Sequence, residues 1–175
     1  RINPNYRSVE PTDTYFGYLA KILSNRKIDL VLDVGASTGN WASQLIDEGC
    51  GSKIISFEPL SNSYRVLNSR CNEFPNWECH NFAIGDIIGQ TSLNVSNNNE
   101  SSSISKILNT HIEAFPESQI IREESIEIKT IDNFLQKRPD LEGNIFAKVD
   151  VQGFEKKVLT GASYSLDRIS ILQLE

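Results

Sequence analysis

The stretch VLDVGASTGNW, from Val31 to Trp41, decides the fold that the rest of the chain is expected to adopt. It joins a short run of leucine and β-branched residues to a turn with two glycines four positions apart. Apolar runs of this kind are typical of strands that are buried on both faces of a parallel sheet. We therefore expect a strand over Asp29–Val34, a tight glycine turn, and then a helix over Asn40–Glu48.

The flanking segments continue this alternation of strand and helix patterns. Residues Thr14–Ser24 carry aromatic and aliphatic side chains at helical spacing, with Asp13 as the expected N-cap. After the glycine turn we expect, in order, a strand over Lys53–Pro59, a helix that Ser61 caps and that runs to about Arg70, and a strand over Trp77–Ile84. Because such units form right-handed crossovers, the pattern predicts an α/β, Rossmann-like doubly wound fold with a mostly parallel sheet and helices on both faces.

The second half of the chain adds four strand patterns and one helix pattern. The strands are expected over Thr91–Val95, Ser125–Ile131, Asn144–Val151 and Ile169–Glu175, and the helix over Phe154–Thr160. A polar tract begins SNNNESSSIS at Ser96, and residues 96–124 are predicted to form a polar loop or insert, either a surface excursion or a functional loop. The 175 residues fit a single domain, 1–175, with an N-terminal helical segment over residues 1–28.

Composition and charge narrow the class of protein. The net charge of -6 opposes binding to nucleic acid, and the basic pairs Arg26–Lys27 and Lys156–Lys157 are isolated, so we expect no nucleic-acid partner. No apolar run approaches the ~18 residues that a membrane span needs. The three cysteines are odd in number and lack metal-ligand spacing, which predicts reduced thiols and a cytoplasmic location.

The glycine turn distinguishes between several classes of ligand. A Walker phosphate loop requires Gly-Lys-Ser/Thr, but Gly39 is followed by Asn40, which excludes that loop. A dinucleotide fingerprint counted from Gly35 requires glycine where Ser37 and Asn40 stand, which disfavours that alternative. A turn preceded by Asp33 suits S-adenosylmethionine, because a helix N-terminus favours its carboxylate and the acid lies near its ammonium. A glycine corner without a ligand is the other alternative.

Glu58 adds a second feature on the same side of the expected sheet. It ends the second expected strand, 19 residues past Gly39. Ligands of open α/β sheets bind at the carboxyl ends of the strands, where an acid can accept hydrogen bonds from both ribose hydroxyls. The alternative is a solvated charge at the end of a strand. We expect Glu58 to bind the ribose of the cofactor.

Six motifs, in this order and at suitable spacing, resemble the FkbM family of S-adenosylmethionine-dependent methyltransferases: VLDVGASTGNW, ISFEP, NFAIGD, IKTID, KVDVQGFEKKVLTGA and the terminal LQLE. The resemblance runs from about Leu30 to Glu175. It implies a class I methyltransferase fold, S-adenosylmethionine as cofactor, and O-methylation of a hydroxyl on a sugar, a glycan or a secondary metabolite. Class I folds normally finish with two further strands, which this sequence lacks. We therefore expect an incomplete chain, or a final edge that another segment or a second subunit of a homo-oligomer completes.

The resemblance also implies roles for individual residues. The cofactor residues would be Asp33, Gly35, Ala36 and Gly39 at the methionine end, Glu58 at the ribose, and Ala83 and Asp86 near the adenine. The motif KVDVQGFE would place Lys148, Asp150 and Glu155 beside the transferred methyl group as catalytic residues. The family often carries Glu where this chain has Gln152, so Gln152 is not expected to act as an acid or a base.

Methylation of an alcohol benefits from a base that takes the hydroxyl proton. Asp150 is the first candidate, because it lies at the carboxyl end of a central expected strand, and Glu155 is the second. The alternatives are that Asp150 orients the sulfonium or pairs with Lys148, and that Glu155 stabilises the first turn of a helix. Nothing in the spacing requires a metal, although Asp150 and Glu155 carry oxygen ligands that suit Mg²⁺. A nicotinamide-dependent oxidoreductase and a catalytically silent binding domain are the rival functions.

Overall fold

The computed structural model describes residues 14–96 and 120–175, and its centre is a parallel sheet of five strands. In spatial order the strands are β3 (Trp77–His80), β2 (Lys53–Phe57), β1 (Ile28–Val34), β7 (Asn144–Val149) and β8 (Ile169–Leu174). All four neighbouring pairs are parallel. The chain runs from β1 outward to β3 on one side and returns to the other side for β7 and β8, so the strand order reverses between β1 and β7.

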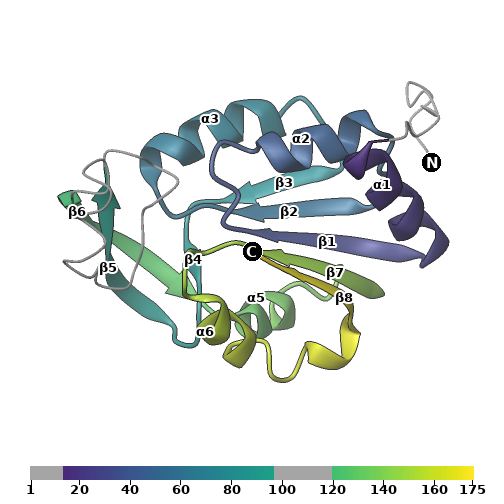
Figure 1. Ribbon diagram of the computed structural model, residues 1–175. Helices are drawn as coiled ribbons and strands as arrows, with labels where there is room; N and C mark the ends of the chain where they lie inside the picture. Colours follow the sequence, from purple (N-terminus) through teal and green to yellow (C-terminus); the bar gives the residue numbers. More distant parts are fainter. Residues whose placement is uncertain (1–13, 97–119) are drawn as a thin grey trace.

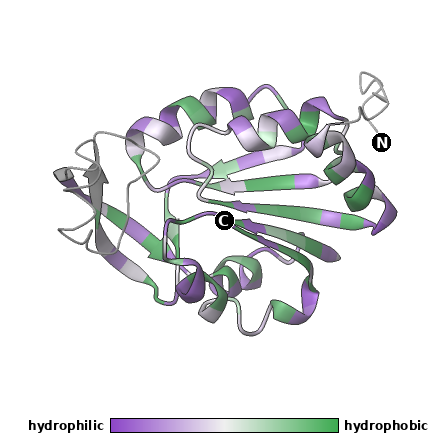
Figure 2. Ribbon diagram, viewed as in Figure 1, coloured by the Kyte–Doolittle hydropathy of each residue, from purple (hydrophilic) through white to green (hydrophobic). Residues whose placement is uncertain are grey.

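Helices cover both faces of this sheet (Figure 1). One face carries α1 (Tyr15–Asn25), α2 (Asn40–Asp47) and α3 (Ser61–Cys71), and the other carries α5 (Ile131–Gln136) and α6 (Glu155–Thr160), with the short 3-10 helix η3 (Leu166–Arg168) before β8. Successive side chains of a strand point to opposite faces of the sheet. In β1, Val31 therefore belongs to one apolar cluster and Leu32 to the other. Figure 2 shows the resulting pattern, in which the central strands are mostly hydrophobic and the helices combine hydrophobic and hydrophilic residues. The predicted doubly wound α/β fold is confirmed.

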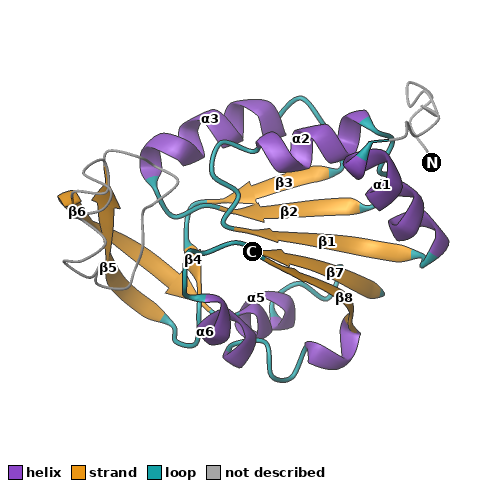
Figure 3. Ribbon diagram, in the orientation of Figure 1, coloured by secondary structure: helices purple, strands orange, loops and turns teal. Residues whose placement is uncertain are grey.

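A second, smaller sheet lies off the carboxyl ends of β1 and β2 (Figure 3). It consists of β4 (Ala83–Ile84), β6 (Ile120–Lys129) and β5 (Gly89–Ser96), with β5 and β6 antiparallel. The expectation of one strand over Trp77–Ile84 was therefore wrong, because the chain leaves the large sheet after His80 and enters the small one at Ala83. The Asn81 amide donates to the carbonyl oxygens of Glu58 and Pro59, both at 2.9 Å, and fixes the bend.

Several element boundaries also differ from those expected. Helix α1 is capped by Thr14, whose hydroxyl accepts a hydrogen bond from the Gly17 amide at 3.0 Å, while Asp13 lies outside the described residues. Strand β6 ends at Lys129, and Ile131 begins a helix instead of ending a strand, because the Thr130 hydroxyl accepts from the third following amide, at 3.0 Å. Most of the predicted polar insert, residues 97–119, lies outside the described residues, and β5 and β6 flank it.

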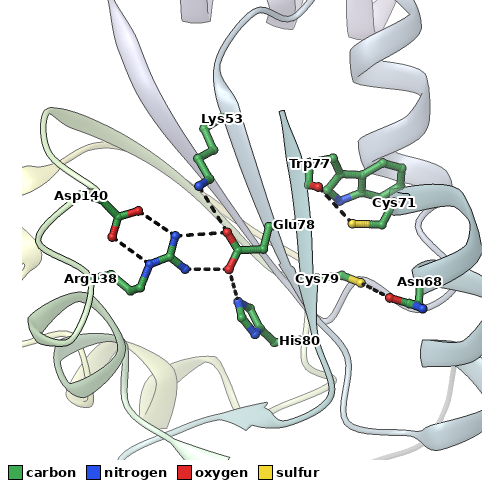
Figure 4. A network of polar contacts seen from close by, with 9 residues as sticks. All are labelled: Lys53, Asn68, Cys71, Trp77, Glu78, Cys79, His80, Arg138 and Asp140. Carbon is green, nitrogen blue, oxygen red and sulfur yellow. Dashed lines mark hydrogen bonds and ion pairs between the residues drawn. The ribbon is translucent and has the colours of Figure 1, made fainter. Parts of the chain in front are cut away.

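A network of charged side chains joins the end of α5 to the edge strand β3 (Figure 4). Arg138 donates to both carboxylate oxygens of Glu78, at 2.6 and 3.1 Å, and to both oxygens of Asp140, at 2.8 Å each. Lys53 and His80 contact the same Glu78 carboxylate at 3.2 and 2.9 Å. Burial opposes the charge of Glu78, but the hydrogen bonds from Arg138 and Lys53 outweigh it and lower its pKa to about 2. The network stabilises the β3 edge of the sheet.

Candidate functional site

A cavity of about 500 Å³ opens at the carboxyl ends of the parallel strands. Its walls come from the turn after β1, the turn after β2, the start of β4, and the residues that follow β7 and β8. The cavity therefore lies where the strand order reverses, which is the usual binding position in open α/β sheets. Its size falls in the range of about 300 to 1,000 Å³ that is typical of sites for small ligands.

The glycine turn forms one wall of this cavity. Gly35 has a φ of +81°, and a Cβ on it would lie 1.9 Å from the carbonyl oxygen of Asp150. Ala36 lines the cavity beside it, and the amides of both residues donate to the Phe57 carbonyl, at 3.1 and 3.0 Å. Only glycine lets the turns after β1 and β7 approach this closely.

Gly39 has a different position from Gly35, since it does not line the cavity. It is the N-cap of α2 with a φ of +82°, and a Cβ on it would lie 2.8 Å from Leu67 and 2.9 Å from Trp77. This glycine allows α2 to pack closely against α3 and β3. The neighbours Thr38 and Asn40 contribute to the cavity wall instead.

Glu58 lies in the cavity wall with only 6% of its surface exposed. One carboxylate oxygen accepts from the Ser37 amide and the other from the Leu60 amide, both at 2.8 Å. Burial raises the pKa of Glu58 to about 7, against the effect of these two hydrogen bonds. A carboxylate offers about four acceptor positions, so Glu58 can still accept from a bound hydroxyl while it ties the glycine turn to the end of β2.

Three charged side chains meet beneath and beside the cavity. Lys148 Nζ lies 3.4 Å from Asp33 Oδ1 and 3.5 Å from Asp150 Oδ2. Asp33 is fully buried and also accepts from the Ser56 hydroxyl at 3.0 Å, whereas Lys148 and Asp150 line the cavity. Burial works against the charge of Lys148, but the two carboxylates outweigh it and raise the pKa of Lys148. With all three groups ionised, the trio carries one net negative charge.

The residues after β7 divide into those in the cavity and those that shape the turn. Gln152, with a φ of +52°, lines the cavity, and its amide donates to Asp150 Oδ1 at 2.9 Å. Glu155 does not line the cavity, because its Oε1 accepts from the Gly153 amide at 2.9 Å and the Val151 amide at 3.3 Å. Glu155 therefore holds the turn that presents Asp150 and Gln152.

One end of the cavity is apolar. Leu60, Ala83, Leu93 and Phe154 line it and belong to one buried cluster. Asp86, expected near the adenine beside Ala83, does not line the cavity, and its Oδ2 lies 3.6 Å from Lys157 Nζ on α6. An apolar surface of this kind suits a flat aromatic ring more than a phosphate.

Several wall residues were not expected from the sequence, among them Trp41, Leu93 and Glu175. Trp41 lines the cavity and stacks on Phe146, with ring centroids 6.0 Å apart and planes 3° apart. Leu93, in β5, and Glu175, directly after β8, line it as well. The position of Glu175 at the carboxyl end of a parallel strand was a usable signal, whereas Leu93 depends on how the small sheet packs against the large one.

The described residues form neither a metal-binding cluster nor a membrane-spanning helix. Across residues 14–96 and 120–175, no three His, Cys, Asp or Glu side chains are grouped so that they could hold a metal ion. His80 contacts Glu78 in the network of Figure 4, and His111 lies outside the described residues. Of the helices in the described part of the chain, none has the length and apolar character to cross a membrane.

Comparisons with known proteins agree with this geometry. A family model described as the methyltransferase FkbM domain matches residues 33–175. Among solved structures, the crystal structure of methyltransferase FkbM from Methylobacillus flagellatus KT superimposes with a TM-score of 0.55 at 16% sequence identity. The match covers 84% of this chain and 32% of that one, so this chain spans about a third of that protein's length. A comparison with curated proteins gives no match.

Proposed function

The chain belongs to the FkbM methyltransferase family, and from this premise we propose that it methylates a hydroxyl group of a glycan or a small metabolite with S-adenosylmethionine. The family supports a methyltransferase activity. We add to this activity the identity of the cofactor and the class of the acceptor. The observation that carries it is the cavity in which the glycine turn, the buried Glu58 and the charged trio converge on one space.

The residues present fit the chemical groups of this cofactor. The turn that contains Ala36 and the first residues of α2 offers backbone amides for a carboxylate. Glu58 accepts hydrogen bonds from ribose hydroxyls, and Leu60 and Leu93 cover the flat face of an adenine. When bound, S-adenosylmethionine supplies an electrophilic methyl group on a positively charged sulfur.

The trio of Asp33, Lys148 and Asp150 complements that positive charge. Asp33 is fully buried below the cavity wall, so it acts through its charge and through Lys148 rather than by direct contact. Gln152 and Lys148 hold the Asp150 carboxylate from two sides, at 2.9 and 3.5 Å. Asp150 is thereby fixed at the cavity wall, where it accepts the proton of the acceptor hydroxyl. A positioned base contributes about 10²- to 10⁴-fold to such a rate.

The roles assigned to Asp33, Gly35, Ala36, Glu58, Ala83, Lys148 and Asp150 are part of this proposal. For Gly39, Asp86 and Glu155 we propose supporting roles in the same site. Gly39 sets the packing of α2, Glu155 holds the turn after β7, and Asp86 pairs with Lys157.

The test is transfer of a labelled methyl group from S-adenosylmethionine to a panel of glycans and small hydroxylated metabolites. The wild-type chain should label at least one acceptor, and Asp150→Asn should lower turnover by about 10²-fold or more with cofactor affinity nearly intact. Asp47→Asn, an exposed change on α2, is the control and should leave turnover unchanged. A large loss of cofactor affinity in Asp150→Asn would assign Asp150 to cofactor binding instead.

A further inference from the structure

Strand β6 sends one carboxylate to the start of helix α3. Glu124 Oε1 accepts from the Ser61 hydroxyl at 2.6 Å and from the Ser61 amide at 3.0 Å. Ser61 is the first residue of α3 instead of its expected cap, and the N-cap, Leu60, provides no side-chain hydrogen bond to the helix. The Glu124 carboxylate therefore replaces the missing cap, at a helix end where the dipole favours a negative charge.

Glu124 lies on the inward face of its strand. Ile126 and Ile128 follow at alternate positions and are both buried, whereas Glu123, Ser125 and Glu127 on the opposite face are exposed. A carboxylate on the apolar face of a strand needs a partner, and Ser61 provides it. This contact fixes how the small sheet sits against the helix layer of the large one.

Both residues of the Glu124–Ser61 contact have neighbours that line the cavity. Leu93 is the cross-strand partner of Glu124, and it lines the cavity together with Leu60. The amides of Leu60 and Ser61, which are consecutive, donate to Glu58 and Glu124 respectively, at 2.8 and 3.0 Å. Two carboxylates from different sheets thus hold the start of α3, and one of them is the candidate ribose ligand.

We propose that Glu124 is a positioning residue for cofactor binding, which holds Leu60 and Leu93 together as the adenine wall and fixes the loop that carries Glu58. The inference rests on the proposed function, since it assigns a role in binding the same cofactor. It predicts that β6 contributes to cofactor affinity, although none of its described residues lines the cavity.

The positioning role of Glu124 can be tested through its effect on the pKa of Glu58. Besides burial, the carboxylates of Asp33 in β1 and Glu124 in β6 also disfavour the charge of Glu58. Removing the charge of Glu124 therefore lowers the pKa of Glu58. If the ionised Glu58 binds the ribose, the pH at which cofactor affinity rises should move to a lower value.

The experiment measures the affinity for S-adenosylhomocysteine from pH 6 to pH 8.5 by calorimetry, for wild type, Glu124→Gln and Glu123→Gln. The control removes the same charge one residue away, on the exposed face of β6. We expect Glu124→Gln to bind about 5- to 20-fold more weakly at pH 8, with its pH midpoint shifted downward. Glu123→Gln should stay within about twofold of wild type with an unchanged midpoint.

A second variant covers the case in which Glu124→Gln does not fold. Ser61→Ala removes the hydroxyl and leaves the amide, and should weaken binding by about two- to fivefold. The inference is overturned if the Glu124 or Ser61 variant binds as wild type does with the same midpoint. A wild-type chain that binds no S-adenosylhomocysteine would overturn the proposed function as well, so the two failures can be told apart.

Discussion

A Cβ added to Gly35 would lie 1.9 Å from the carbonyl oxygen of Asp150, so the turns after β1 and β7 are in backbone contact at this point. The contact brings the expected methionine-end turn beside the candidate base. The positive φ of Gly35, +81°, adds a second reason why a side chain is not tolerated here.

Gly35→Ala should therefore lower the free energy of unfolding by about 2 kcal/mol or more and abolish cofactor binding. Gly51→Ala is the matched control, because a Cβ there meets no atom within 4 Å. Urea denaturation and calorimetry measure the two effects. Equal stability of the two variants would show that the turns can separate without cost.

Lys148 lies between the buried Asp33 and the partly exposed Asp150. Lys148→Met would leave the Asp33 carboxylate buried without its cation, which typically costs about 3 to 5 kcal/mol of stability. Lys157→Met breaks a more exposed pair with Asp86, at 3.6 Å, and should cost less than about 1 kcal/mol. Thermal and urea unfolding at pH 7.5 measure the loss of stability in each variant. Similar losses in Lys148→Met and Lys157→Met would show that the buried position of the Lys148 pair does not raise its contribution.

Glu58 should make stability depend on pH in an unusual direction. Its pKa in the folded chain is about 7, against an ordinary value of 4.5, so the folded state holds a proton that the unfolded chain has released. The contribution of Glu58 is fully present below pH 4.5 and is lost as pH rises to 7, by up to about 3 kcal/mol. In urea denaturation, the stability of wild type relative to Glu58→Gln should fall across this window. Parallel curves for the two proteins would show that the pKa is not raised.

Glu78 should behave in the opposite way. Its pKa of about 2, below the ordinary 4.5, means that the ion pairs of Figure 4 stabilise the fold above pH 4.5 and lose this effect as pH falls towards 2. Because Glu78 is about a third exposed, we expect only about 1 kcal/mol at neutral pH. Wild type should exceed Glu78→Gln by this amount at pH 7 and match it near pH 2. A difference that persists at pH 2 would point to packing rather than charge.

The large sheet could be predicted from the sequence because its signals are local. The strand before Gly35 and the strand before Glu58 are short and rich in leucine, isoleucine and valine, and parallel strands bring their carboxyl ends together. The break after His80 could not be predicted, because it depends on the Asn81 amide reaching carbonyl groups 22 and 23 residues earlier in the chain. Helix α5 has six residues and directly follows a strand, so its pattern is too short to be distinct.

Part of the candidate site could likewise be predicted from the sequence, and part could not. Gly35, Glu58 and Asp150 come together because each follows or ends a central strand. Three other expected residues lie outside the cavity wall, and their neighbours are determined by packing. Gly39 lies against Leu67 and Trp77, Asp86 pairs with Lys157, and Glu155 accepts from two backbone amides. The Glu124 contact with Ser61 spans 63 residues and joins a strand of the small sheet to helix α3, which no local pattern indicates.

Calorimetric titration of the chain with S-adenosylhomocysteine, and separately with NAD, measures whether the cavity binds the proposed cofactor. We predict one-to-one binding of S-adenosylhomocysteine, little or no binding of NAD, and about 10- to 100-fold weaker binding of S-adenosylhomocysteine by Glu58→Ala. Absence of S-adenosylhomocysteine binding by the folded wild-type chain, or preferential binding of NAD, would contradict this prediction.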